Sequence, residues 1–172
     1  GYDGNYNSLS SVEAYNTVTK QWSTLPPMKS RRIGCAAGVL DGKMIVVGGG
    51  DGKNYLASVE EYNPTTQKWV TISPMHIRRS YCAVAVLGGK LYAMGGCNYD
   101  GGEFNYLSSV EVYDPTTKRW TLIADMSTAR SGCAAASPGG KIVVVGGYDG
   151  SGELSSCEEY DTTTHKWSRI AS

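Results

Sequence analysis

The 172-residue sequence has no excess of charge of either sign, because sixteen basic residues balance sixteen acidic ones. A protein that binds nucleic acid through its phosphates needs a basic surplus, so the balance argues against a nucleic-acid partner. No apolar run approaches the roughly 20 residues that a membrane-spanning helix requires. We therefore expect neither a nucleic-acid nor a membrane partner.

Residues that mark metal, redox and secreted proteins are also scarce. Five cysteines, an odd number at scattered positions, do not predict a disulfide framework. The two histidines, His76 and His165, are 89 residues apart, and no Cys-x-x-Cys spacing is present. We expect no secretory leader, and no nucleotide-binding or hydrolase motif occurs. We expect a cytoplasmic, non-enzymatic protein with no cofactor, metal or catalytic residue.

The sequence does contain a repeat. Tryptophans at 22, 69, 120 and 167 are 47, 51 and 47 residues apart, and a tyrosine precedes each by seven residues. Pairs of glycines that begin at Gly48, Gly95 and Gly146 show the same steps of 47 and 51. A fixed period near 50 residues indicates a repeat architecture.

Each repeat predicts four short antiparallel strands. In the first whole repeat these are 34–40, 43–48, 58–62 and 68–72, and Asp41-Gly42 supplies a hairpin turn. The other whole repeats have turns at Gly88-Gly89 and Gly139-Gly140. The segment 97–108 is expected to be a loop four residues longer than its counterpart, which accounts for the 51-residue step. Four strands per repeat, with no helix between them, are typical of a β-propeller blade.

Small residues fill the first strand of each repeat, where blades would crowd around an axis. Cys35, Cys82 and Cys133 recur in phase among alanines, and we interpret them as packing residues. The repeated tyrosine and tryptophan would pack between blades farther out. Cys97 follows a glycine pair and is the best candidate for an exposed thiol.

These motifs resemble the kelch repeat, and most closely the kelch domains of BTB-kelch adaptors of cullin ubiquitin ligases. The resemblance implies an all-β propeller segment within one domain, 1–172: a half blade (1–29) and three full four-stranded blades (30–76, 77–127, 128–172). Closed kelch propellers have five to seven blades, so we expect either a segment of a longer propeller or two arcs that pair into a homo-oligomer. A self-assembling engineered repeat without a ligand is a further alternative.

The resemblance also implies that one rim binds a partner protein, here through an acidic peptide. Contacts are expected just before each first strand and just after each glycine pair. The positions are Arg32, Ile33, Arg79, Ser80, Arg130 and Ser131, with Tyr2, Gly50, Cys97 and Tyr148 after the glycines. Arg31 and Arg78 have Ala129 as their counterpart in the third repeat, so we expect them to be exposed and to contact the partner. Alternatively, Arg32, Arg79 and Arg130 are structural and pair with the glutamates that recur in the same phase, Glu13, Glu60, Glu111 and Glu158.

The loops that vary between repeats are the expected place for specificity. Tyr55, Phe104, Tyr106 and Glu153 lie in them, and Phe104 is the single phenylalanine of the chain. The competing functional class is a kelch-fold carbohydrate enzyme, an oxidase or epimerase. Such an enzyme would need clustered His, Tyr or paired carboxylates at one mouth of the propeller.

Overall fold

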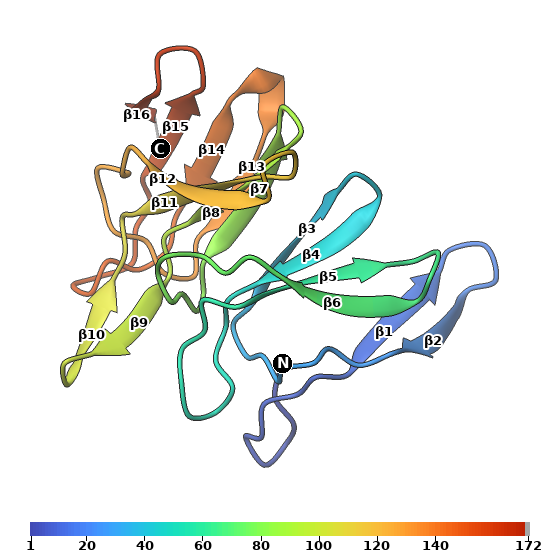
Figure 1. Cartoon of the computed structure of the whole chain (residues 1–172). Coiled ribbons are helices and arrows are strands. Elements are labelled where there is room, and N and C mark those ends of the chain that lie inside the picture. The colour runs from blue at the N-terminus through green and yellow to red at the C-terminus, as the bar shows by residue number, and fades with distance from the viewer. Residues whose placement is uncertain (171–172) are drawn as a thin grey trace.

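A computed structural model describes residues 1–170 as a succession of antiparallel sheets (Figure 1). Blade one contains β3 (Ala36–Leu40), β4 (Lys43–Val47), β5 (Val59–Asn63) and β6 (Lys68–Ile72). Blade two contains β7 (Ala83–Leu87), β8 (Lys90–Met94), β11 (Val110–Asp114) and β12 (Arg119–Ile123). Blade three contains β13 (Ala134–Ala136), β14 (Ile142–Val145), β15 (Cys157–Asp161) and β16 (Lys166–Ile170). In each blade the strands pair in chain order, which confirms the predicted four-stranded antiparallel unit.

Two further pairs complete the description. β1 (Val12–Asn16) and β2 (Gln21–Leu25) form the predicted half blade. β9 (Cys97–Asp100) and β10 (Glu103–Tyr106) form a hairpin within the segment that the sequence predicts as a loop. Gly101-Gly102, both with positive φ, provide its two-residue turn. A three-residue 3-10 turn, η1 (Pro138–Gly140), replaces the simple hairpin turn in blade three.

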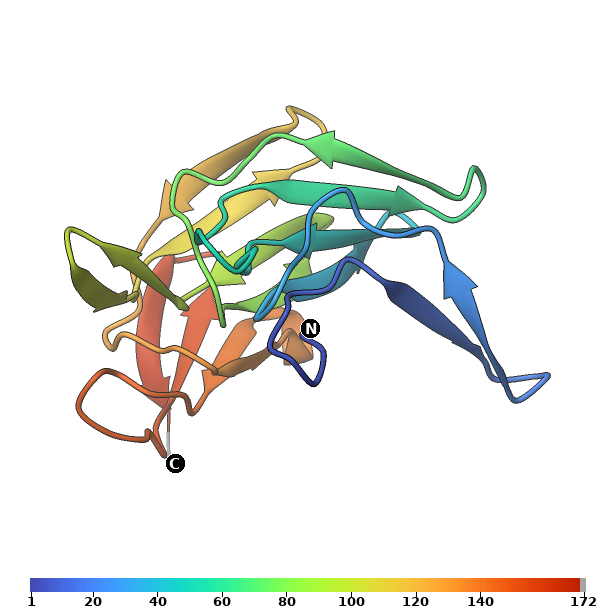
Figure 2. The same cartoon turned by 90° about the horizontal axis from the view of Figure 1, so that it is seen from below.

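The blades stand side by side, and the strands nearest the shared centre are the first ones of each sheet. β7 neighbours both β3 and β13, and Figure 2 shows the sheets fanning out from this centre. One buried cluster joins blades one and two, a second joins blades two and three, and a third joins the half blade to blade one. The sheets of residues 1–170 form an open arc and do not close into a ring.

The same backbone hydrogen bonds cross each full blade junction. The N–H of Gly49 donates to the carbonyl of Arg79 at 2.7 Å, and that of Gly96 donates to Arg130 at 2.8 Å. In the opposite direction, Tyr81 N–H donates to Gly34 (2.7 Å). At the next junction, the N–H of Gly132 donates to the carbonyl of Tyr81 at 2.8 Å. The junction between blades is therefore repeated, as the blade itself is.

The repeated tryptophans seal the outer part of each junction. The indole Nε1 of Trp69 donates to Pro26 O, and that of Trp120 donates to Ser73 O, at 2.7 and 2.9 Å. Both side chains are buried, whereas Trp22 of the half blade is 68% exposed. The exposed Trp22 therefore marks a blade face that the described residues leave uncovered.

None of the secondary structure in residues 1–170 is a helix of the length and apolarity needed to cross a membrane.

Candidate functional site

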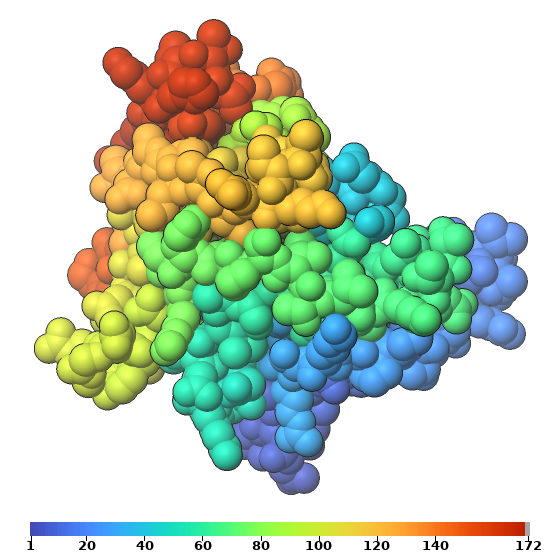
Figure 3. Space-filling model, viewed as in Figure 1, coloured from blue at the N-terminus to red at the C-terminus, as the bar shows by residue number. Residues whose placement is uncertain are grey.

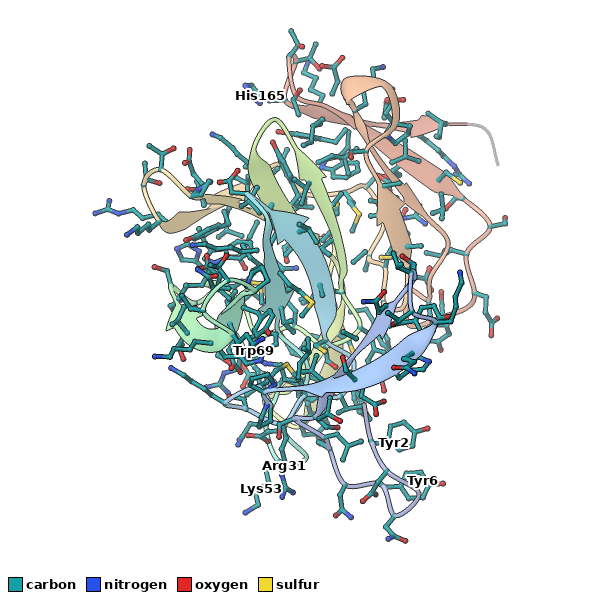
Figure 4. The ribbon with its side chains drawn as sticks, turned by 90° about the vertical axis from the view of Figure 1, so that its right-hand side faces the viewer. Tyr2, Tyr6, Arg31, Lys53, Trp69 and His165 are labelled. Carbon is teal, nitrogen blue, oxygen red and sulfur yellow. The ribbon has the colours of Figure 1, made fainter. Side chains whose placement is uncertain are left out.

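The two ends of the blades are built differently. One end holds the strand hairpins, including the turn with His165. The other holds four loops, 2–8, 50–56, 97–106 and 148–154, which we call the rim loops. Figure 4 shows Tyr2, Tyr6, Arg31 and Lys53 together at this end, and His165 at the opposite one. The side chains that vary between repeats thus gather on one face.

Beneath the rim loops, each blade contains a buried arginine whose guanidinium group is surrounded by the same kinds of acceptor. In blade one, Arg32 Nε and Nη2 donate to Glu60 Oε1 (3.2 and 2.9 Å). Its Nη1 donates to Gly48 O and Ser58 O, and Nη2 also reaches Ser58 Oγ. Arg79 with Glu111 and Arg130 with Glu158 repeat the arrangement, and all six side chains are at most 1% exposed.

The glutamates of these pairs also fix the segment that enters each blade. Glu60 accepts the backbone N–H groups of Lys29 and Ser30 at 2.6 and 3.0 Å. Glu111 and Glu158 accept the equivalent amides of the later junctions. Arg32, Arg79 and Arg130 therefore fit the alternative in which they are structural residues paired with glutamates. Their guanidinium groups are buried and saturated, so they do not offer donors at the rim surface.

Other predicted contact residues are only partly available. Ser80 and Cys97 exchange both backbone hydrogen bonds (2.9 and 2.8 Å) and are 2% and 6% exposed. The prediction of an exposed thiol at Cys97 is wrong, because this bridge holds the residue against the blade. Ile33 pairs in the same way with Gly50, and Ser131 with Tyr148. The side chains of Ile33 and Ser131 are half-buried.

A cleft of about 460 Å³ lies between two neighbouring rim loops. We call it the rim cleft, and it is lined by Lys53, Asn54, Tyr55, Arg78, Tyr99 and Phe104. Tyr99 and Phe104 face each other across the β9–β10 hairpin, edge to face at 5.1 Å, and are 50% and 58% exposed. A smaller hollow of about 230 Å³ adjoins it beside Tyr55 and Tyr81. The cleft thus combines exposed aromatic rings with two basic side chains.

The remaining predicted residues lie on the flanking rim loops. Tyr2 stacks on Tyr6 with ring centroids 5.6 Å apart, and both rings are exposed. Tyr148 packs edge to face against Tyr106 at 5.3 Å. Its backbone bridges to the exposed Glu153. These aromatic pairs extend the rim surface to both sides of the cleft.

Sequence reasoning missed Tyr99, Lys53 and Tyr81 as members of this surface. Tyr99 could have been found from Asp100-Gly101-Gly102-Glu103, because a two-residue turn there places Tyr99 opposite Phe104. No pattern identifies Lys53 and Tyr81, since they reach the cleft and the adjoining hollow from different repeats.

Comparison with known proteins agrees with this architecture. A family model described as the KLHDC2/KLHL20/DRC7 Kelch-repeats domain matches residues 1–172. The chain belongs to the kelch-repeat family. Within it, the kelch domain is 47% identical over 45 residues to Kelch-like protein 5 of Homo sapiens, covering 26% of this chain and 6% of the relative. It is 51% identical over 41 residues to an F-box/kelch-repeat protein of Arabidopsis thaliana, covering 24% and 11%.

A further relative is Kelch-like protein 25 of Rattus norvegicus, 42% identical over 52 residues, which are 30% of this chain and 9% of the relative. The kelch domain thus matches only a small part of the length of these curated relatives. The family membership indicates a module for protein interaction.

Three rim loops of the kelch domain are held by aspartates in the same phase. Asp149 Oδ1 accepts hydrogen bonds from the Ser151 hydroxyl and from the Ser151 and Gly152 amides, at 2.7 to 2.9 Å. These bonds lower the pKa of Asp149 below 3.8, with the Ser151 side chain as the largest cause. Asp3 and Asp51 accept comparable bonds, and their pKa values are lowered too.

We expect these loops to keep their turn structure as the pH falls through 3.8. Because the pKa is lowered, the carboxylate contributes fully to the stability of the loop above its unfolded-state pKa of 3.8. This contribution is lost as the pH falls through the lower pKa of the folded state. An NMR titration of the Ser151 and Gly152 amide resonances should have its midpoint below pH 3.8. In Asp149→Asn they should stay constant, and an Asp149 midpoint at or above 3.8 would contradict the assignment.

The in-phase cysteines of the kelch domain pack close to the glycine pairs. Burial raises the pKa of Cys82 to about 12, and burial also raises that of Cys133. Such thiols remain protonated and are poor nucleophiles. Among residues 1–170 no cluster of three His, Cys, Asp or Glu side chains is arranged to hold a metal ion.

Proposed function

We propose that the kelch domain is a protein-interaction module that binds a short acidic segment of a partner in the rim cleft. The observation that carries the proposal is the meeting of Tyr55, Tyr99 and Phe104 with Lys53 and Arg78 at one cleft. Exposed aromatic rings and arginine are the side chains that contribute most to protein interfaces. They offer an apolar seat and charged donors for carboxylates.

The basic groups of this surface are available for a ligand. Arg31, Arg78 and Lys53 are exposed, and none of the ion pairs formed within residues 1–170 involves them. This differs from Arg79, whose charge is already matched by Glu111 at 3.2 Å. The acidic-peptide hypothesis therefore rests on Arg31 and Arg78, the exposed arginines that precede the buried Arg32 and Arg79.

We expect Arg78→Ala and Phe104→Ala each to weaken binding of an acidic peptide at least tenfold, because each removes a side chain that lines the cleft. Peptides selected from a random library against the kelch domain serve as probes, with affinities measured by fluorescence anisotropy. Lys68→Ala is the matched control, since Lys68 is also exposed but lies in β6 on the hairpin side. Equal affinities in all three variants would refute the rim cleft as the binding site.

We further propose that the protein recruits its bound partner to a ubiquitin ligase in the cytoplasm. This step is supported by the resemblance to BTB-kelch adaptors and by relatives named Kelch-like and F-box/kelch-repeat proteins. Purification of the full-length protein from cells should then recover a cullin. Recovery of the partner without any cullin would limit the function to binding.

The open blade faces call for a covering partner. We propose that further blades, from the same polypeptide or from a second copy, pack on Trp22 of the half blade and on blade three. Light scattering distinguishes these sources, because a particle of 18.4 kDa would exclude pairing of two arcs.

A further inference from the structure

At the hairpin end, away from the rim, two grooves of the same construction separate successive blades. The first lies between blades one and two and has a volume of about 570 Å³. The second lies between blades two and three and has a volume of about 280 Å³. Figure 3 shows the face on which β6, in green, lies next to the yellow-to-orange segment that contains β11 and β12.

The two grooves are lined by equivalent positions of the repeat. Leu40, Lys43 and Ile72 of the first correspond to Leu87, Lys90 and Ile123 of the second. On the facing blade, Tyr113 corresponds to Tyr160. Because these positions are equivalent, a residue that differs between them contributes to the difference in volume.

One such position is on the second strand of each blade, where β4 has Ile45 and β8 has Tyr92. In the second groove the Tyr92 ring reaches across to Tyr160, with ring centroids 6.4 Å apart, and is 8% exposed. The protein therefore fills this groove with a phenol of its own. In the first groove, Tyr113 stands at the position of Tyr160. The Ile45 side chain, at the position of Tyr92, is too short to reach across to it.

The first groove also has polar groups that suit a phenolic hydroxyl. Lys43 Nζ pairs with Glu61 Oε1 at 2.8 Å, at positions that both line the groove. In the second groove Val112 replaces Glu61, and Lys90 pairs instead with Asp114 at 3.0 Å. The first groove alone thus has a carboxylate that can accept a hydrogen bond from a bound hydroxyl.

We propose that the first groove is a binding site for a small phenolic compound, whose ring takes the place that Tyr92 takes in the second groove. The volume lies within the range of roughly 300–1,000 Å³ that is usual for small-molecule sites. Leu40, Ile45 and Ile72 supply apolar contacts for the ring, and the Glu61 carboxylate accepts a hydrogen bond from its hydroxyl group. The site is independent of the rim cleft, so its test does not depend on peptide binding.

The probe is p-cresol, which is the tyrosine side chain as a free molecule, followed by amide chemical-shift changes in the ¹⁵N-labelled chain. We expect shifts around Lys43, Glu61 and Tyr113 and none around Lys90 and Tyr160. Ile45→Tyr should weaken binding at least tenfold, because the new ring occupies the site. Should that variant not fold, Ile45→Phe provides the same obstruction.

Tyr92→Ile is the converse variant and should create a second p-cresol site around Lys90 and Tyr160. N-acetyltyrosinamide tests whether the ring belongs instead to a partner's tyrosine, and we expect it to bind at least tenfold more weakly than p-cresol. Tighter binding of the amide would overturn the assignment to a free phenol. Absence of shifts in the first groove, or unchanged binding in a folded Ile45→Tyr, would overturn the site itself.

Discussion

Gly95→Ala is expected to lower the free energy of unfolding by more than about 3 kcal/mol. Gly95 has a φ of +61°, which alone costs an alanine about 1–2 kcal/mol. A Cβ at this position would also lie 2.2 Å from the carbonyl oxygen of Arg130, in the next blade. That oxygen accepts the cross-junction hydrogen bond from Gly96, so it cannot move without loss of the bond.

Gly146→Ala separates these two causes. Gly146 has nearly the same φ, +63°, but its Cβ would approach nothing closer than 3.4 Å, because no blade follows it within the described residues. We expect this variant to lose only about 1–2 kcal/mol. Urea unfolding of both variants measures the difference. Equal losses would show that backbone strain, and not the approach of the next blade, determines the requirement for glycine.

Glu111→Gln is expected to lower the free energy of unfolding by about 3–5 kcal/mol, because it leaves the Arg79 charge buried without its carboxylate. Both side chains are fully buried, and Glu111 also accepts the His76 and Ile77 amides. The loss should therefore include a loosened connection between blades one and two. Urea unfolding measures the free energy, and amide hydrogen exchange at His76 and Ile77 measures the loosening.

The control is Glu13→Gln, which changes the equivalent residue of the half blade. Glu13 is exposed on β1, so its substitution should alter stability by less than about 0.5 kcal/mol. A loss below about 1 kcal/mol in Glu111→Gln would mean that the buried pair contributes little beyond what a neutral hydrogen-bonded pair provides.

The blades were predictable because a repeat supplies its own internal comparison. The strands at 43–48 and 68–72 follow from hairpin glycines, apolar runs and positions that recur at 47-residue steps, and their observed bounds differ by at most one residue. The β9–β10 hairpin was missed because it occurs in one repeat only. A feature without a counterpart has to be recognised from its local turn alone.

The rim surface was harder to predict because burial is a tertiary property. Arg31 and Arg32 are adjacent in sequence, yet one is exposed and the other fully buried. Their phase distinguishes them, since only Arg32 has a counterpart in every whole repeat and a glutamate to match. The partners of Lys53 come from another repeat, and no sequence spacing connects them.

The rim loops are closed at their bases by one repeated bond. Leu56 N–H donates to Gly49 O, Leu107 to Gly96 and Leu154 to Gly147, at 2.8 to 2.9 Å, although the segments enclosed differ in length. Because each rim loop begins and ends at the same backbone hydrogen bond, its length and composition can change without altering the sheet below. Loops could therefore be exchanged between repeats, or grafted from one propeller to another, and ligand preference would travel with the grafted segment.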